Sequence, residues 1–124
     1  MDLGISANVA PLLAAVKRFI EEEIHPVEYD YYADIAVGDR WQFTQRQTDI
    51  REGLKAKARA KGLWNFCLTD GDAGSGLNTV EYAYLAEEMG KSHMAAEVFN
   101  CSAPDTGNME VLHKYGTEAQ KQQW

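Results

Sequence analysis

The sequence predicts an all-α domain in which amphipathic helices pack as a bundle. Two observations carry this prediction: apolar residues recur at helical spacing along most of the chain, and a glycine follows most of the periodic segments. Amphipathic helices joined by short turns that contain glycine are typical of helical bundles. A chain of 124 residues fits one domain and buries roughly two thirds of its unfolded surface on folding. We therefore expect residues 1–124 to form a single helical domain.

The first helix is expected to begin near Asn8, whose side chain can cap it, with Pro11 in the first turn, where a missing N–H does no harm. Pro26 is expected to end this helix shortly after Ile24. Its apolar stripe consists of Val9, Leu12, Leu13, Val16, Phe19 and Ile20. This stripe is predicted to face the core.

Residues 27–47 have a weak periodic signal but many aromatic side chains. These aromatics are Tyr29, Tyr31, Tyr32 and Trp41. We expect them to pack a long connection against the helices. A lid over a pocket is the alternative.

A second helix is predicted over residues 48–61, with a capping box at Asp49 and Glu52 and a stop at Gly62. Ile50, Leu54, Ala58 and Lys61 recur at helical spacing, and we expect them to form a narrow and small inward face. A short apolar run at 63–68 and a glycine-rich stretch at 70–76 follow.

A third helix is expected to start after Asn78 and to stop at Gly90. Val80, Ala83, Tyr84 and Met89 form its stripe, and Tyr82, Leu85 and Ala86 broaden it. A helix that is apolar over so much of its circumference is usually covered on more than one side. A fourth helical region covers residues 94–101, and a fifth covers 105–115, with the interruption Ser102-Ala103-Pro104 between them.

The end of the sequence has a helix start signal without a stop. Thr117 and Gln120 have the S/T-x-x-E/Q spacing of a capping box, and only four residues follow, up to Trp124. A helix of about two turns is not stable without packing. We therefore expect that the last helix, from about residue 117, is cut short and that the natural chain continues past Trp124.

Composition argues against several classes of function. The formal net charge of −7 repels nucleic acid and acidic lipid, and no segment approaches the length of a membrane-spanning helix. The acidic residue Asp2 does not suit a secretory or organellar leader. Cys67 and Cys101 have apolar neighbours and no metal-ligand spacing, which indicates reduced, partly buried thiols. We expect a cytoplasmic protein that binds no nucleic acid and does not span a membrane.

Taken alone, the residues indicate no active site. Asp70, Asp72 and Glu81 fall at ligand positions of an EF-hand calcium loop, but Gly74 and Ser75 do not suit the positions they occupy. The glycine order does not match a nucleotide-binding loop. The three histidines, which are His25, His93 and His113, have no metal-binding spacing. A calcium-binding helix pair stays open as an alternative.

Several segments nevertheless resemble one family in their order and spacing. The motif Gly62-Leu63-Trp64, the loop that ends in Gly76-Leu77, and the segment Tyr82–Lys91 are similar to the N-terminal domain of acyl-CoA dehydrogenases. The last stretch, Tyr115–Trp124, is similar to that family's [FY]-G-[TS]-E-x-Q-K-x-x-[WY] motif. The segment Cys101–Glu110 resembles the branch that includes mammalian family members ten and eleven.

This resemblance implies a flavoenzyme of three domains, helical, β and helical, that assembles as a dimer or tetramer. FAD would be held mainly by the second and third domains. A carboxylate of the third domain would abstract the α-proton of an acyl-CoA, while the β-hydride passes to flavin N5. The resemblance thus implies that the β domain and C-terminal helical domain lie outside this chain, with the catalytic residues downstream of Trp124. An electron-accepting flavoprotein is a further partner that it implies.

The part implied for this domain is packing and one section of the acyl-chain pocket wall, without activity of its own. An ungapped count from Gly116 places the family's wall positions on Phe99, Asn100 and Ala103. Phe99 could instead be a core residue. The glycine-rich loop departs from the family pattern at Asp70 and Asp72, so no substrate contact is assigned to it. The rival function is a free-standing helical interaction module without chemistry.

Overall fold

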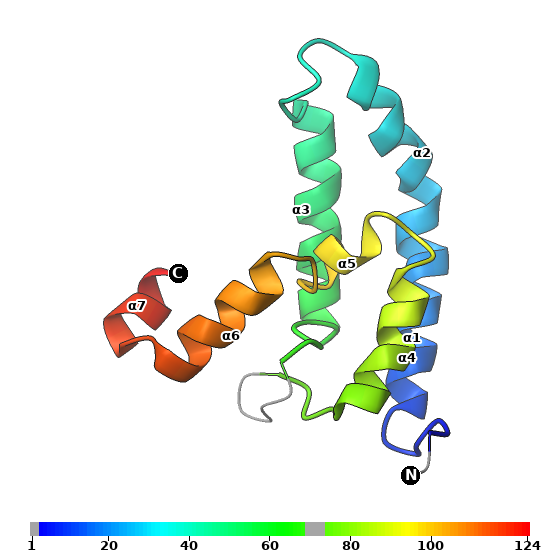
Figure 1. Cartoon of the computed structure of the whole chain (residues 1–124). Helices are drawn as coiled ribbons and strands as arrows, with labels where there is room; N and C mark the ends of the chain where they lie inside the picture. The colour runs from blue at the N-terminus through cyan, green and yellow to red at the C-terminus, as the bar shows by residue number, and fades with distance from the viewer. Residues whose placement is uncertain (1–2, 69–73) are drawn as a thin grey trace.

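The computed structural model describes residues 3–68 and 74–124, and over these ranges the chain is helical with no strand. The predicted all-α fold is therefore confirmed. Figure 1 shows a long rod of helices running beside α3, with α4 against the lower part of the rod. The elements are α1 (Ala10–Phe19), η1 (Ile20–Ile24), α2 (His25–Ala33), η2 (Asp34–Ala36), α3 (Gln45–Ala60), α4 (Thr79–Met89), α5 (Ala95–Val98), α6 (Asp105–Tyr115) and α7 (Glu118–Gln123).

The start of α1 differs from the prediction in its cap. The backbone N–H of Val9 donates to Ser6 Oγ at 3.1 Å. Asn8 does not cap the helix, because its side chain donates to Glu81 on α4 at 3.4 Å. Pro11 lies in the first turn, as predicted.

The prediction that Pro26 ends the first helix is wrong. Between α1 and α2 the chain forms the π-helical segment η1, in which the backbone N–H of His25 donates to the carbonyl of Ile20, five residues earlier. Pro26 then lies in the first turn of α2, where a backbone N–H would have no partner within the helix, so its absence costs no hydrogen bond. The wider turn therefore lets the rod continue to Ala33.

Helix α3 begins earlier than predicted, at a capping box formed by Thr44 and Gln47 rather than by Asp49 and Glu52. The Gln47 N–H donates to Thr44 Oγ1 at 3.1 Å, and Gln47 Oε1 accepts from the Thr44 N–H at 3.0 Å. The buried Gln47 amide also donates to the Tyr31 carbonyl at 3.0 Å. This last bond links the start of α3 to the end of α2.

The aromatic side chains of residues 27–47 follow the packing prediction only in part. Tyr31 and Tyr32 are partly buried and pack against the core. Tyr29 and Trp41 are 82% and 83% exposed, so for them the prediction is wrong. Most of the predicted connection is helical, because α2 and η2 reach Ala36.

Gly62 ends α3 as predicted, in a Schellman motif. Its φ is 71°, and its N–H donates to the Arg59 carbonyl at 3.0 Å. The Leu63 N–H donates to the Ala58 carbonyl at 2.9 Å. A left-handed residue is needed at this position, and glycine takes that conformation without steric cost.

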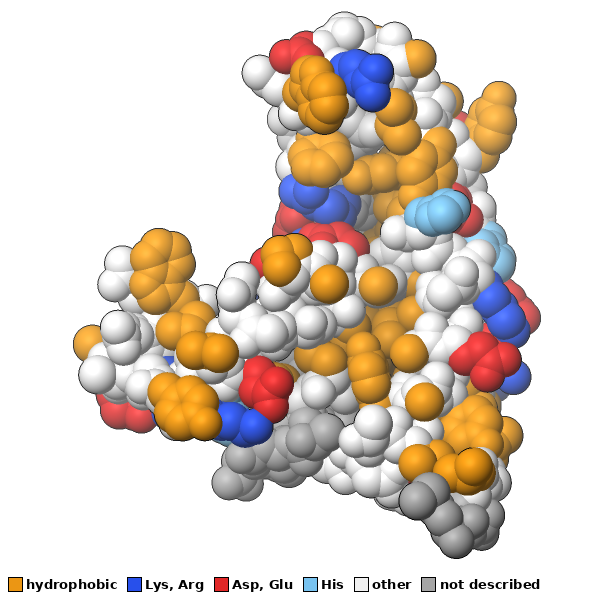
Figure 2. All heavy atoms as spheres, in the orientation of Figure 1, with side chains coloured by type: hydrophobic (Ala, Val, Ile, Leu, Met, Phe, Trp, Pro, Cys, Tyr) orange, Lys and Arg blue, Asp and Glu red, His pale blue; other side chains and the backbone are white. Residues whose placement is uncertain are grey.

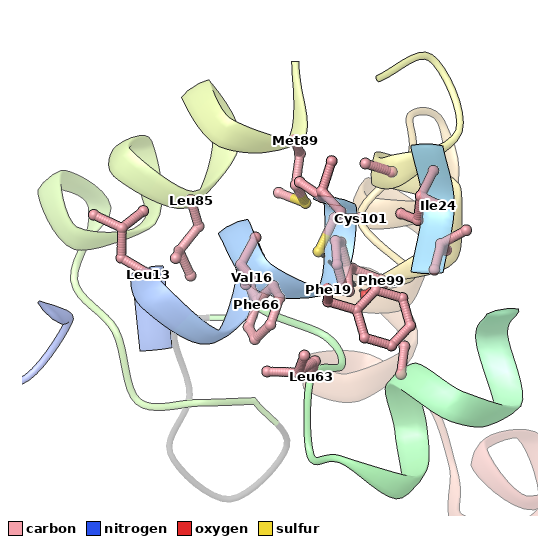
Figure 3. Packing of buried hydrophobic residues seen from close by; sticks show 14 of the residues in the cluster. Leu13, Val16, Phe19, Ile24, Leu63, Phe66, Leu85, Met89, Phe99 and Cys101 are labelled. Atoms are coloured by element: carbon pink, nitrogen blue, oxygen red, sulfur yellow. Dashed lines mark hydrogen bonds between the residues drawn. The ribbon is translucent and has the colours of Figure 1, made fainter. Parts of the chain in front are cut away.

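The core joins the predicted stripe of α1 to buried residues of η1, α3, α4 and α5 and of the segments beside them. Phe19, Phe66 and Phe99 are at most 2% exposed and lie among aliphatic side chains (Figure 3). The face of α4 that reaches this core contains Leu85 and Met89. The predicted stripe of α4 is therefore wrong in part, because Ala83 is exposed. The buried apolar cluster is Val9, Leu13, Val16, Phe19, Ile20, Ile24, Leu54, Ala58, Leu63, Phe66, Leu77, Leu85, Met89, Met94, Ala95, Val98, Phe99 and Cys101.

Helices α6 and α7 form an arm that projects sideways from the bundle (Figure 1). Neither helix has a buried residue. The predicted capping box of the last helix is present: the Gln120 N–H donates to Thr117 Oγ1 at 3.3 Å, and the Thr117 N–H donates to Gln120 Oε1 at 2.9 Å. The arm thus forms helices through local signals.

Candidate functional site

The three predicted wall residues lie at the corner between α5 and α6, in three different environments. Phe99 is fully buried and makes ring contacts with Phe19 at 5.3 Å and with Phe66 at 5.7 Å between centroids. Asn100 is partly buried, and Ala103 is exposed. Asn100 and Ala103 therefore have surface to offer a ligand, whereas Phe99 supports the corner from within the core.

Asn100 ends α5 in a second Schellman motif. Its φ is 57°, its N–H donates to the Glu97 carbonyl at 3.1 Å, and the Cys101 N–H donates to the Ala96 carbonyl at 2.7 Å. Asparagine tolerates the left-handed conformation better than most residues do. Unlike glycine at the end of α3, it also brings a side-chain amide to the corner.

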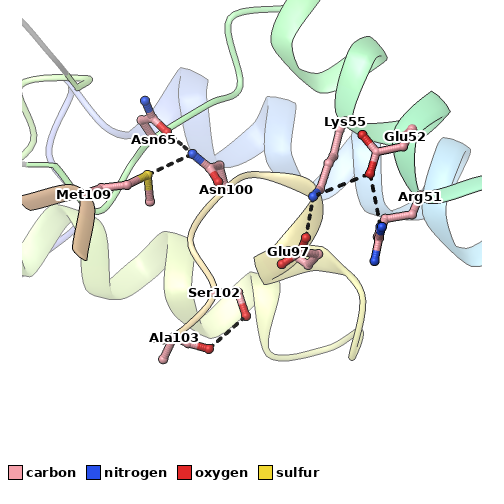
Figure 4. Close-up of polar contacts among 9 residues, drawn as sticks. All are labelled: Arg51, Glu52, Lys55, Asn65, Glu97, Asn100, Ser102, Ala103 and Met109. Carbon is pink, nitrogen blue, oxygen red and sulfur yellow. Dashed lines mark hydrogen bonds and ion pairs between the residues drawn. The ribbon is translucent and has the colours of Figure 1, made fainter. Parts of the chain in front are cut away.

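That amide belongs to a small network with the segment that follows α3 (Figure 4). Asn100 Nδ2 donates to Asn65 Oδ1 at 2.6 Å and to Met109 Sδ at 3.0 Å. The Asn65 backbone N–H donates to the Phe99 carbonyl at 3.1 Å. The corner is thus tied to the bundle by a backbone bond and by side-chain bonds between the same two segments.

A groove of about 490 Å³ lies between α3, the corner and the arm. Figure 2 shows the same arrangement from outside, with the arm set apart from the upper bundle by an indentation. Helix α3 forms one side of the groove, and α6 together with Trp124 forms the other. The lining residues are Glu52, Lys55, Arg59, Trp64, Asn100, Asp105, Asn108, Met109, Leu112 and Trp124.

The charged groups on the α3 side of the groove are paired. Lys55 forms an ion pair with Glu97 and lies 3.8 Å from Glu52, which also accepts from Arg51 at 3.1 Å (Figure 4). The guanidinium of Arg59 stacks over Trp64, 4.4 Å from the ring centroid. Because these pairs reach solvent, each adds little to stability. The carboxylates neutralise Lys55, whereas Arg59 keeps its charge, because the indole of Trp64 is neutral.

Two thiols and a tyrosine lie behind the corner. Cys67 Sγ donates to the Asn100 carbonyl at 3.9 Å, and Cys101 Sγ donates to the Phe99 carbonyl at 3.4 Å. Burial raises the pKa of Cys101 to about 12 and that of Tyr82 to about 12, and it also raises the pKa of the Cys67 thiol. Both cysteines are free thiols. Neutral groups of this kind serve neither as nucleophile nor as general base near pH 7.

The candidate calcium loop falls mainly outside the described residues, which include neither Asp70 nor Asp72. The third proposed ligand, Glu81, has another role. One of its oxygens accepts from the Asn78 N–H at 3.0 Å, and the other accepts from the Ser6 hydroxyl. These bonds lower the pKa of Glu81, with the Ser6 hydroxyl as the larger cause. The carboxylate is thus the N3 member of the capping box of α4, whose N-cap is Asn78.

Two wider features complete the description of the site. Within residues 3–68 and 74–124, no three metal-binding side chains gather in one place. None of the helices in these ranges combines the length and the apolar character that a bilayer crossing requires.

Sequence reasoning found the corner but missed Asn65 and Met109, which hold it. Asn65 also has a left-handed backbone, with φ at 58°. An asparagine two residues before Cys67, outside any periodic segment, was the available signal, because asparagine is enriched at such positions. Its pairing with Asn100, 35 residues later, is a tertiary contact and leaves no local signal.

Comparison with known proteins agrees with this architecture. Residues 8–124 match the family described as acyl-CoA dehydrogenase, N-terminal domain. The chain is 48% identical to acyl-CoA dehydrogenase family member 10 of Mus musculus, over 98% of this chain and 11% of that protein. It is 48% identical to family member 11 of Rattus norvegicus, over 91% of this chain and 14% of that protein. A solved structure from Mycobacterium abscessus, described as an acyl-CoA dehydrogenase, superposes with a TM-score of 0.83 at 47% identity, over 98% of this chain and 31% of that one.

The fold and the corner define an all-α domain with a groove between α3 and the arm. The chain belongs to the acyl-CoA dehydrogenase family, as its N-terminal domain. The resemblance read from the motifs is thereby confirmed. The chain spans 11%, 14% and 31% of the lengths of the three proteins compared.

Proposed function

We propose that the protein carrying this domain is an FAD-dependent acyl-CoA dehydrogenase, which oxidises the Cα–Cβ bond of an acyl-CoA thioester. The domain would supply packing and part of the acyl-chain pocket wall, and would be inactive alone. The observation that carries this proposal is the match of residues 8–124 to the family's N-terminal domain, supported by the TM-score of 0.83.

The proposed wall is the corner between α5 and α6. Asn100 and Ala103 are accessible there, and Phe99 fixes the corner through its contacts in the core. A rigid wall would hold the acyl chain so that the bonds to be broken are aligned with the reacting groups. It would also exclude water from the charge that develops during the reaction. Both effects act through position and need no acid or base from this domain.

The groove offers little that could hold a flavin diphosphate. Of the cations that line it, Lys55 is paired with carboxylates, which leaves Arg59, stacked over Trp64, as the single cation available to a phosphate. We therefore propose that FAD is held by parts of the protein outside this chain. A homo-oligomeric assembly, an electron-accepting flavoprotein as partner and a cytoplasmic location belong to the same proposal and rest on the family relationship.

The test is to express the coding sequence with everything that flanks it, and to record visible absorption after gel filtration. The expected result is a retained flavin band that bleaches when an acyl-CoA is added. The 124-residue chain alone serves as the control and should be colourless and inactive. A colourless full product, or turnover by the control chain, would overturn the proposal.

A second function, a helical interaction module, is favoured by one observation. The arm exposes large apolar side chains: Val111 at 59%, Tyr115 at 80% and Trp124 at 81%. Exposed apolar groups that lie together commonly mark a surface that another protein segment covers. A colourless full-length product that retains a bound protein partner would support this function instead.

A further inference from the structure

We propose that Asn65 is a positioning residue for the acyl-chain pocket wall: it holds the side-chain amide of Asn100 in one orientation at the corner. This inference rests on the proposed function, because it takes Asn100 to be part of the wall. It adds a residue that the wall positions themselves do not include. Asn65 lies behind Asn100, where it lines a smaller hollow of about 220 Å³ beside Leu68 and Met109.

The hydrogen bonds at Asn100 leave its amide a single orientation. Nδ2 donates to Asn65 Oδ1 at 2.6 Å and to Met109 Sδ at 3.0 Å. A thioether sulfur has no hydrogen and can only accept, so the NH₂ group has to face Met109. With the amide reversed, the Asn100 oxygen would face both the sulfur and the Asn65 oxygen. Asn65 Oδ1 and Met109 Sδ therefore act together on one side chain.

The backbone of Asn65 fixes the acceptor in place. Its N–H donates to the Phe99 carbonyl at 3.1 Å, next to the amide that its side chain holds. Both asparagines have left-handed φ values, 58° and 57°, and their side chains meet between the two segments. A change at Asn65 would thus be transmitted to Asn100, a residue that lines the groove.

Two substitutions separate this role from a purely structural one. Asn65→Gly suits the left-handed backbone at no steric cost and removes the side chain, and with it the acceptor for Asn100. Asn65→Asp keeps an acceptor oxygen in the same place and tolerates the same φ. The two variants therefore share a backbone and differ in the bond to Asn100.

The first measurement is steady-state kinetics of the flavin-loaded full-length protein with straight-chain acyl-CoAs of short, medium and long chains. In Asn65→Gly, KM is expected to rise by about threefold to tenfold for the preferred chain length, the range that one net hydrogen bond supplies. The selectivity among chain lengths should change, while kcat and flavin content stay close to wild type. Asn65→Asp should keep the wild-type profile. A wild-type profile in Asn65→Gly, or equal changes in both variants, would overturn the inference.

The second measurement does not depend on activity. In the 124-residue chain, the side-chain amide protons of Asn100 are followed by ¹H–¹⁵N NMR. They should exchange slowly in wild type and in Asn65→Asp, and fast in Asn65→Gly. If Asn65→Gly does not fold, Asn65→Ala takes its place, because it also lacks the acceptor and loses less backbone entropy on folding than glycine does. Unchanged exchange in the folded variant would refute the positioning role. A full-length protein without flavin or turnover would instead refute the proposed function.

Discussion

Replacing Phe99 by alanine distinguishes a core residue from a wall residue. The ring is fully buried and contacts Phe19 and Phe66 at centroid distances of 5.3 and 5.7 Å. Truncation of a buried phenylalanine to alanine costs about 3–5 kcal/mol, which includes the loss of the ring pairs and the cavity left behind. The free energy of unfolding of a domain of this size is about 5–15 kcal/mol. Phe99→Ala should therefore remove about a fifth or more of the stability.

The assay is urea unfolding of the 124-residue chain, followed by far-ultraviolet circular dichroism. Phe99→Leu, which keeps most of the volume, should cost less than about 1.5 kcal/mol. Trp41→Ala is the control for loss of an aromatic ring, and because Trp41 is 83% exposed its effect should stay within about 0.5 kcal/mol. If Phe99→Ala costs less than about 1 kcal/mol, well under the range for a buried ring, the core assignment is wrong and Phe99 faces the pocket.

Three further predictions test local parts of the fold. Gly53→Ala, inside α3 with open space at the Cβ position, should stabilise the chain by about 0.5–1 kcal/mol, whereas Gly62→Ala, at a φ of 71°, should destabilise it by about 1–2 kcal/mol, both measured by urea unfolding. The folded-state pKa of Glu81 lies below its ordinary value of 4.5, so its contribution to the free energy of unfolding is present above that pH and is lost as the pH falls through the lowered pKa. Glu81→Gln should therefore flatten the acidic side of the plot of stability against pH, and an unchanged plot would contradict the bonds to this carboxylate. Iodoacetamide should modify Cys67 before Cys101 in the folded chain, because Cys101 is more buried and its pKa is about 12; equal rates by mass spectrometry would contradict the placement of Cys101.

Sequence reasoning succeeded where the cause is local. The apolar stripe of α1 follows the helical period, and Gly62 is the residue that a left-handed helix end requires. The start of α4 at Asn78 and the start of α7 at Thr117 both follow from capping boxes. In each case the signal and the structure lie within a few residues of each other, so the sequence contains the whole argument.

Where prediction failed, a distant or unusual contact decided the structure. Pro26 is compatible with a continuous rod only because the π-helical turn before it widens the backbone, and no simple periodicity marks that turn. Thr44 caps α3 with the help of a glutamine that is also bonded to Tyr31 on α2. The same holds for the site: the position of Asn100 could be counted from the motif, but its link to Asn65 is tertiary.

The domain divides into a bundle with a buried core and an arm without buried residues. All the buried apolar side chains of the core come from the bundle, whereas α6 and α7 bury none. The arm holds its helices through a capping box and ion pairs such as Glu110 with Lys114, and each such pair adds only a few tenths of a kcal/mol. Helices shorter than about 12 residues are marginal on local terms alone. Tyr115 and Trp124 remain exposed on this arm, and Trp124 lines the groove. Exposed apolar side chains of this kind give the arm the character of a surface that another protein segment covers.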